Sequence, residues 1–254
     1  MKNKIFNEDC LITLQRMENN YLNGVITSPP YNIIRANSLD RGYDVYKDGM
    51  DNDEYIDFTI KLFKQFERVV KKDGVVLYNM SYGAENTEVM SLTVADIIRN
   101  TNFTIADIII WKKNSAIPNN VSKNRLTRIV EYIYVFCRRD ELMSFNTNKK
   151  AIYKRSSGQS IFENINNFIT AKNNDGANEL NKATYSTELV NKLYDIYFSK
   201  DDVIYDPFMG TGTTAVSVLN KGGIYIGSEL SKAQCDYAED RLKQASGEVG
   251  LFAL

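Results

Sequence analysis

The chain has no histidine among its 254 residues. This absence excludes serine–histidine hydrolysis, imidazole acid–base catalysis and most catalytic zinc sites, because each requires a histidine ring nitrogen. Cysteine is scarce as well: Cys10, Cys137 and Cys235 lie far apart, and no two of them have C-x-x-C spacing. Such a set predicts neither a disulfide framework nor a zinc site, and it favours the reducing cytoplasm.

Long hydrophobic runs are also absent. No stretch of eighteen apolar residues occurs, and no long apolar segment follows Lys2 and Lys4. We therefore expect no membrane span, no secretion signal and no membrane partner. The length and the 43% hydrophobic content are sufficient for a substantial core, so we expect residues 1–254 to form a single catalytic domain.

The net charge is only −1, but the charges are unevenly distributed. Residues 111–156 contain 11 basic and three acidic residues, which gives +8 there and leaves −9 for the rest of the chain. A basic segment on an acidic body favours a polyanion as the partner of one face. A solvated, lysine-rich surface is the alternative interpretation.

Apolar runs of strand length alternate with amphipathic segments along most of the chain. We expect strands near residues 4–7, 24–27, 74–80, 104–112, 131–137, 203–206 and 223–227. We expect helices after Asp9 and at 55–70, 89–100, 187–198 and 213–220. Gly74 is expected to close the helix at 55–70. The alternation predicts an α/β fold with a mostly parallel sheet.

Two segments interrupt this alternation. Residues 33–54 are polar and rich in aspartate, asparagine and glycine, and we expect a mobile loop there. Residues 139–182 are rich in asparagine, lysine and serine, with weak strand candidates at 160–162 and 168–170. We expect the second segment to form a small insertion.

The stretch Thr27-Ser28-Pro29-Pro30-Tyr31-Asn32 follows a short buried strand. Two consecutive prolines fix φ and contribute no N–H, so they end the strand and turn the chain outward. The proline carbonyls and the hydroxyl of Ser28 then face whatever lies beside the ring of Tyr31. The stretch predicts a pocket for a flat ring that bears an amino group.

A glycine-rich turn lies between the strand at 203–206 and the helix at 213–220. Gly210 and Gly212 allow a tight turn and a close approach of the backbone to a ligand at the start of that helix. Glu229 follows nineteen residues after Gly210, at the tip of the next strand, where a carboxylate can accept both hydroxyls of an adenosine ribose.

The turn therefore predicts an adenosine-containing cofactor, and an NAD-dependent oxidoreductase is the alternative. Only about forty residues follow the turn, too few for the rest of a dinucleotide fold in its usual order. A phosphate-binding loop is disfavoured, because Thr213 and Thr214 stand where Gly-Lys would be needed.

Two motifs of a known family are matched here, and they occur in the order typical of one of its classes. The first is Ser28-Pro29-Pro30-Tyr31, and the second, about 175 residues later, is Asp206 to Thr214. The chain resembles the β-class S-adenosylmethionine-dependent DNA amino-methyltransferases of the N-4/N-6 family. The resemblance runs from Ile5 to about Leu242 and includes "RVVKKDG" at 68–74 and "EYIYVFCRR" at 131–139. It implies a circularly permuted, Rossmann-like methyltransferase fold with a doubly wound sheet. The 139–182 insertion is the candidate target-recognition region, and the basic segment 112–155 and the loop 33–54 are further candidates for reading the DNA sequence.

The resemblance also implies a site for S-adenosyl-L-methionine within a cofactor-binding unit at 200–245. Glu229 would bind the ribose, and Asp9 and Cys10 would lie near the adenine, although Asp9 alone would be interpreted as a helix N-cap. The remaining cofactor residues would be Asp206, Phe208, Gly210 and Gly212 along the cofactor, and Thr213 and Thr214 near its carboxylate. The histidine and proline that the family often carries before the preceding helix are replaced here by the segment 182–187.

In such an enzyme Ser28 and the Pro29 carbonyl would accept the N–H groups of an exocyclic amino group, and Tyr31 would stack on the base. Pro30 would complete the motif. The base would be flipped out of double-stranded DNA, and the methyl group would move in line to nitrogen. Serine before the prolines favours cytosine N4 over adenine N6.

Other outcomes remain open from the sequence. RNA or protein is an alternative methyl acceptor, and a catalytically inactive nucleic-acid-binding relative is an alternative of another class. A homodimer and a cognate restriction endonuclease are the further partners to test for.

Overall fold

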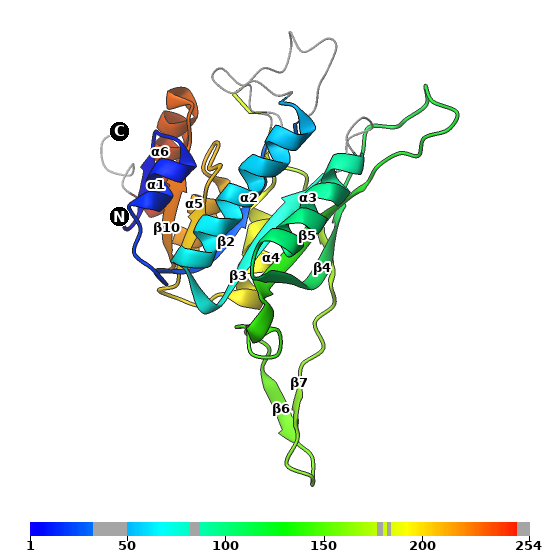
Figure 1. The fold of residues 1–254 in the computed structure, drawn as a ribbon, viewed down its shortest axis with the longest axis vertical. Coiled ribbons are helices and arrows are strands. Elements are labelled where there is room, and N and C mark those ends of the chain that lie inside the picture. The colour runs from blue at the N-terminus through cyan, green and yellow to red at the C-terminus, as the bar shows by residue number, and fades with distance from the viewer. Residues whose placement is uncertain (33–49, 82–86, 177–179, 182–183, 248–254) are drawn as a thin grey trace.

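A computed structural model describes residues 1–32, 50–81, 87–176, 180–181 and 184–247 (Figure 1). Eight strands form the main sheet in the order β1-β10-β9-β2-β3-β5-β4-β8. Neighbouring strands are parallel, except that β5 runs antiparallel to both β3 and β4. The predicted mostly parallel sheet is confirmed. The bounds are β1 (Lys4–Phe6), β2 (Leu22–Thr27), β3 (Val70–Met80), β4 (Phe103–Lys113), β5 (Val130–Arg138), β8 (Phe168–Ala171), β9 (Val203–Asp206) and β10 (Ile224–Ser228).

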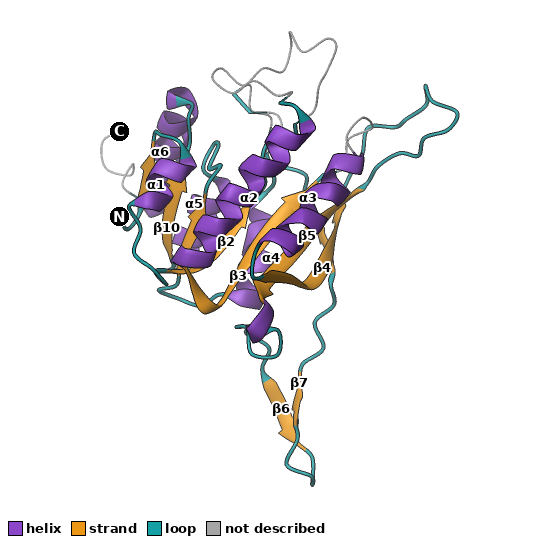
Figure 2. Cartoon of the chain, in the orientation of Figure 1, coloured by secondary structure: helices purple, strands orange, loops and turns teal. Residues whose placement is uncertain are grey.

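Helices cover both faces of the sheet, as expected for a doubly wound fold (Figure 2). One apolar cluster packs α1 (Cys10–Gln15), α2 (Asn52–Val69) and α3 (Thr87–Asn100) against the first face. A second cluster packs α4 (Thr187–Tyr197), α5 (Thr213–Asn220) and α6 (Lys232–Ser246) against the other. No helix in the described part of the chain is long and apolar enough to cross a membrane.

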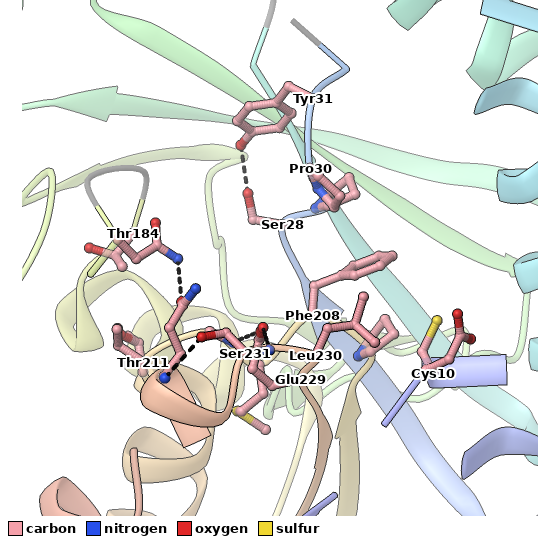
Figure 3. A pocket seen from close by; sticks show the side chains of 18 of the residues that line it. Cys10, Ser28, Pro30, Tyr31, Thr184, Phe208, Thr211, Glu229, Leu230 and Ser231 are labelled. Carbon is pink, nitrogen blue, oxygen red and sulfur yellow. Dashed lines mark hydrogen bonds between the residues drawn. The ribbon is translucent and has the colours of Figure 1, made fainter. Parts of the chain in front are cut away.

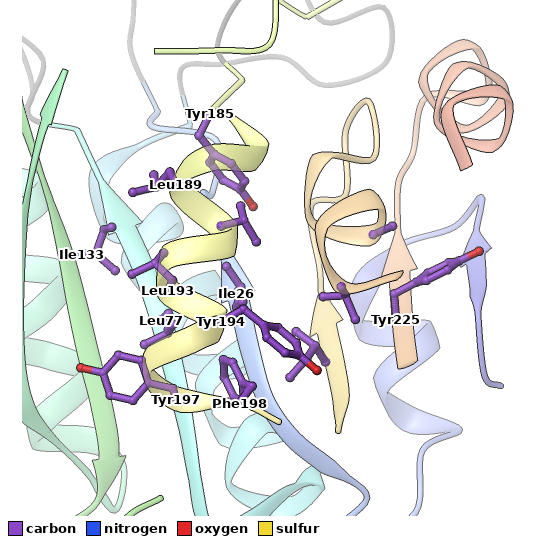
Figure 4. Packing of buried hydrophobic residues seen from close by; sticks show 14 of the residues in the cluster. Ile26, Leu77, Ile133, Tyr185, Leu189, Leu193, Tyr194, Tyr197, Phe198 and Tyr225 are labelled. Carbon is purple, nitrogen blue, oxygen red and sulfur yellow. The ribbon is translucent and has the colours of Figure 1, made fainter. Parts of the chain in front are cut away.

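The packing of α4 follows directly from its sequence pattern. Ser186 caps the helix by accepting the N–H of Leu189 at 3.3 Å. Leu189 and Leu193 are buried on one side of α4 and belong to the same apolar cluster as Ile26 and Leu77 of the sheet (Figure 4). Each such leucine stabilises the fold by about 1.5–3 kcal/mol.

The strand order brings distant segments of the chain to one edge of the sheet. Because β2 pairs in parallel with β9, the carboxyl end of β2 meets the carboxyl end of β9. β1 pairs with β10 at the border of the sheet, with Ile5 opposite Gly227. The N-terminal strand is thus held beside the last strand of the chain, which is the arrangement that a circular permutation requires.

Gly74 does not close α2, so that prediction was wrong. The helix passes directly into β3 through Val70, which has an extended backbone. A Cβ atom at Gly74 would lie 2.6 Å from both the Asn23 carbonyl oxygen and Val70 Cγ1. The glycine therefore permits close packing where the register between β2 and β3 shifts, between Leu22 and Gly24.

The loop predicted at 33–54 overlaps a helix at its end. Asp51 caps α2 by accepting the N–H of Asp53 at 2.9 Å, so α2 begins at Asn52 and not at the predicted Tyr55. Residues 33–49 lie outside the described part of the chain.

The segment 139–182 contains a projecting hairpin and one strand of the main sheet. Both weak strand candidates are strands: β7 (Ser160–Phe162) pairs with β6 (Ala151–Lys154), and β8 pairs with β4. A short 3₁₀ turn, η2 (Arg139–Glu141), follows β5. Since β5 is antiparallel to its neighbours, the chain leaves it at the amino edge of the sheet, and the β6–β7 hairpin points away from the body there (Figure 1).

Candidate active site

A cavity of about 310 Å³ lies at the carboxyl ends of β2, β9 and β10. This size is within the usual range of small-molecule sites. The cavity joins the two stretches singled out in the sequence, although they lie far apart along the chain. The predicted residues that line it are Asp9, Cys10, Ser28, Pro29, Pro30, Tyr31, Phe208, Gly210, Thr213 and Glu229.

Asp206 is not among the lining residues and lies behind the wall of the cavity. Its buried carboxylate accepts hydrogen bonds from Thr27 Oγ1 at 2.7 Å, Thr214 Oγ1 at 2.6 Å and the Phe208 N–H at 3.0 Å. Burial raises the pKa of Asp206, and these hydrogen bonds oppose the rise. Asp206 and Thr214 therefore tie β2 to the glycine-rich turn from inside.

Gly212 also lies behind the cavity wall, as the N-cap of α5 with φ +84°. A Cβ atom there would lie 2.7 Å from Cβ of Ala238 in α6. The glycine thus serves both the left-handed backbone of the turn and the close approach of two helices.

Glu229 is fixed at the tip of β10 by backbone donors (Figure 3). Its Oε2 accepts the N–H of Gly210 at 2.8 Å, and its Oε1 accepts the N–H of Ser231 at 2.9 Å. Burial raises the pKa of this carboxyl, and the backbone hydrogen bonds oppose the rise. The acid and the glycine-rich turn therefore form one unit.

The cavity wall near Glu229 is largely apolar. Phe208 and Leu230 both line it, and the Phe208 ring lies 6.2 Å from that of Phe58. Asp9 lines the same region and also caps α1, since it accepts the Leu11 N–H at 2.7 Å. A carboxylate beside apolar walls matches the diol and the flat ring of an adenosine.

Cys10 also lines the cavity but is buried at the start of α1. Burial, with a smaller contribution from the charge of Asp9, raises the pKa of the Cys10 thiol far above its usual range. Burial therefore disfavours the thiolate form at this position.

Ser28 and Tyr31 lie together at the other end of the cavity (Figure 3). Ser28 Oγ and Tyr31 OH are 2.6 Å apart. Asn79 Nδ2, at the end of β3, is 2.9 Å from Tyr31 OH and 3.3 Å from Ser28 Oγ. The motif is therefore anchored to the neighbouring strand through its two hydroxyls.

Glu131 completes a polar network beneath these hydroxyls. Its Oε2 accepts from Asn79 Nδ2 at 2.7 Å and lies 3.5 Å from Tyr31 OH, and its Oε1 pairs with Lys113. A carboxylate without a proton only accepts hydrogen bonds, so it fixes the orientation of the Asn79 amide with nitrogen toward Tyr31 and Ser28.

Asn79, Glu131 and Lys113 were not predicted from the sequence. Asn79 and Lys113 lie near the carboxyl ends of β3 and β4, and Glu131 lies near the amino end of β5, which runs antiparallel to both. Asn79 and Glu131 are 4% and 6% exposed. In the sequence, these residues are marked only as polar positions next to apolar ones. That pattern does not show which residues contact one another in the fold.

The segment 182–187, where the sequence departs from the family pattern, contributes to the cavity. Thr184 and Tyr185 line it, and Tyr185 OH donates to Asp206 Oδ2 at 3.1 Å. Residues 182 and 183 lie outside the described part of the chain. On the opposite side of the glycine turn, Arg241 donates to the Thr211 carbonyl at 2.9 Å.

The layered fold and this cavity define the class: the chain is an α/β protein of the Rossmann-like methyltransferase type. The family model N6_N4_Mtase, described as DNA methylase, matches residues 22–240. The chain belongs to this DNA methylase family.

Individual relatives agree with this assignment. The chain is 26% identical over 251 residues to the orphan methyltransferase M.BamHII of Bacillus amyloliquefaciens, covering 86% of this chain and 87% of that one. It is 25% identical to the type II methyltransferase M.HinfI of Haemophilus influenzae, covering 95% of this chain and 68% of the relative.

Solved structures share the fold. The cytosine-N4-specific PvuII DNA methyltransferase superimposes with a TM-score of 0.72 at 17% identity, covering 94% of this chain and 85% of that one. M1.HpyAVI in complex with SAM superimposes with a TM-score of 0.59 at 20% identity, covering 94% and 98%.

Proposed function

We propose that the chain transfers a methyl group from S-adenosyl-L-methionine to the exocyclic amino group of a flipped base in double-stranded DNA. The observation that carries the proposal is the shared cavity, in which Ser28 and Tyr31 lie at one end and Glu229 at the other. Membership of the DNA methylase family supports DNA as the substrate.

The residues around Glu229 fit the cofactor. The Glu229 carboxylate accepts the ribose hydroxyls, and Phe208 and Leu230 contact the adenine, with Asp9 and Cys10 beside it. Thr213, at the start of α5, faces the carboxylate of the cofactor, where helix N–H groups favour an anion. When bound, the cofactor supplies an electrophilic methyl group on a sulfonium.

Ser28 and Tyr31 prepare the acceptor nitrogen. An exocyclic amino group is a weak nucleophile because its lone pair is delocalised into the ring. Ser28 Oγ and the Pro29 carbonyl accept its two N–H groups and direct the lone pair toward the methyl group, while Tyr31 stacks on the base. The new N–C bond forms as the S–C bond breaks, and the methylated nitrogen then releases a proton to water.

We propose cytosine N4 as the target, with adenine N6 as the alternative. Serine in the first position of Ser28-Pro29-Pro30-Tyr31 supports cytosine. The similarity to the type II methyltransferase M.HinfI supports a role in DNA modification in the cytoplasm, with a restriction endonuclease as a partner to test for. Light scattering of the purified protein tests for a homodimer.

A competition assay tests the substrate class. The protein is incubated with S-adenosyl-L-methionine carrying a labelled methyl group and with equal masses of unmethylated duplex DNA, RNA and a protein mixture. Label is expected in the DNA, and it is expected to be lost with Ser28→Ala while cofactor binding is kept. Label mainly in RNA or protein, or no transfer by a protein that binds the cofactor, would contradict the proposal.

A further inference from the structure

The loop between β4 and β5, residues 114–129, lies at the same edge of the sheet as the cavity. β3 and β4 both run antiparallel to β5, so their carboxyl ends lie together with the amino end of β5. The loop begins directly after Lys113, the last residue of β4, and ends directly before Val130, the first residue of β5. The second residue of β5 is Glu131, which contacts Asn79 and Tyr31. The loop therefore begins and ends next to the network under the catalytic motif.

The basic segment 111–156 is thus divided between two opposite edges. Figure 1 shows the β4–β5 loop projecting upward and the β6–β7 hairpin projecting downward. The hairpin leaves from the end of β5 that is far from the cavity. Of these two projections, the β4–β5 loop is the one that carries its cations on the cavity side.

The loop combines cations with exposed apolar side chains. No acidic residue occurs between Lys112 and Val130, while the loop itself contains Lys123, Arg125 and Arg128. Val121 and Leu126 are 98% and 87% exposed. Side chains this exposed gain nothing from folding, and exposed apolar surface marks a contact with a partner where it is contiguous.

The two apolar side chains lie near the tip of the loop. The N–H of Asn119 donates to Thr127 Oγ1 at 3.0 Å, which closes the segment between them. Val121 and Leu126 lie inside that closed segment, together with Lys123 and Arg125. An apolar tip between cations is complementary to a double helix, which is anionic outside and apolar where bases stack.

We propose that residues 114–129 bind duplex DNA and that Val121 and Leu126 enter the stack at the place of the flipped base. The inference rests on the proposed methyl transfer to DNA. Lys123 and Arg125 contact phosphates and position the loop, and the apolar side chains occupy the space that the base leaves. They thereby reduce the cost of unstacking, which is otherwise borne by the binding of the base in the cavity.

The first experiment measures binding without catalysis. A fluorescent 30-base-pair duplex is titrated with the full chain, and anisotropy is recorded at several salt concentrations. Lys123→Gln with Arg125→Gln is expected to weaken binding about tenfold and to reduce the salt dependence. Lys72→Gln with Lys200→Gln, two exposed lysines outside the basic segment, is the matched control and is expected to bind like the wild type. Equal binding by the loop variant and the wild type would overturn the proposal, whether or not methyl transfer occurs.

The second experiment isolates the apolar side chains. After the methylated sites in plasmid DNA have been mapped, one site is placed in a duplex with its target base either paired or mismatched. Val121→Ser with Leu126→Ser is expected to slow methylation of the paired duplex about tenfold and to approach the wild-type rate on the mismatched one, because a mismatched base is easier to flip. Ile12→Ser with Leu92→Ser, two exposed apolar side chains on helices outside the basic segment, serves as the control.

Two outcomes of the second experiment would contradict the proposed role of Val121 and Leu126. An equal loss on both duplexes would mean that the loop acts only through general binding, and no loss on either would mean that its apolar side chains stay outside the helix. Failure of the proposed function looks different, because the wild type would then methylate neither duplex while still binding the cofactor.

Discussion

Asn79 and Glu131 hold the hydroxyls of Ser28 and Tyr31 at one end of the cavity. Both are buried, and Asn79 Nδ2 lies within hydrogen-bond distance of both hydroxyls and of the Glu131 carboxylate. The Lys113 ammonium balances the charge of Glu131. Ser28 is therefore held in place by the Asn79 amide, which the Glu131 carboxylate orients in turn.

Asn79→Ala is predicted to reduce kcat about 10- to 100-fold with little change in cofactor affinity. The substitution removes the Asn79 hydrogen bonds to both hydroxyls and leaves Glu131 without one donor, which costs about 1–3 kcal/mol of positioning or stability. Steady-state kinetics and isothermal titration with the cofactor provide the measurement. Asn148→Ala, outside the cavity wall, is the control, and equal losses of kcat in both variants would contradict the role of Asn79.

Glu229 is predicted to make cofactor affinity depend on pH. Burial raises its pKa above the ordinary glutamate value, so protonation begins at a higher pH than in a free side chain. The ionised carboxylate is the stronger acceptor for the ribose hydroxyls, so affinity is expected to fall as the pH is lowered through the raised pKa.

The pH dependence is tested by titrating the wild type and Glu229→Gln with S-adenosyl-L-methionine at several pH values between neutral and mildly acidic. The variant is predicted to bind about 10- to 100-fold more weakly at neutral pH, because a hydrogen bond to a charged group contributes about 1.5–3 kcal/mol. It is also predicted to lose this pH dependence. A variant that keeps the wild-type pH profile would show that another group is responsible.

Among the elements, α5 and α6 meet at a contact that requires glycine. Gly212→Ala is predicted to destabilise the protein by about 2–4 kcal/mol, from a left-handed backbone and from a Cβ atom 2.7 Å from Ala238 Cβ. Gly158→Ala is the matched control, since Gly158 has φ +83° but nothing within 4 Å of an added Cβ. The difference between their free energies of unfolding in urea isolates the packing contribution, and equal values would contradict it.

The periodicity of the sequence predicted most elements because each depends on local residues. The bounds of α5 were predicted from the glycine turn and the apolar residues that follow it. Gly74 was misinterpreted because glycine serves both helix ends and close packing, and only the neighbouring strand shows which applies. The network of Asn79, Glu131 and Lys113 joins three strands, so local patterns could not reveal it.

At the scale of the whole molecule, the strand order brings residues near the N-terminus and residues near the C-terminus together around one cavity. Residues near positions 9, 28, 208 and 229 meet because β1 and β2 border the unit formed by β9 and β10. The two motifs and their order were enough to predict this meeting. The division of the basic segment between two edges could not be predicted, because it depends on the antiparallel direction of β5.

Nucleoside mass spectrometry tests the central claim most directly. Unmethylated duplex DNA is incubated with the protein and labelled S-adenosyl-L-methionine and is then digested to nucleosides, with Ser28→Ala as the control. Labelled N4-methylcytosine is predicted for the wild type and none for the variant. Labelled N6-methyladenine would be consistent with a DNA methylase but would contradict cytosine N4 as the target. The absence of both, from a protein that binds the cofactor, would contradict methylation of a DNA amino group.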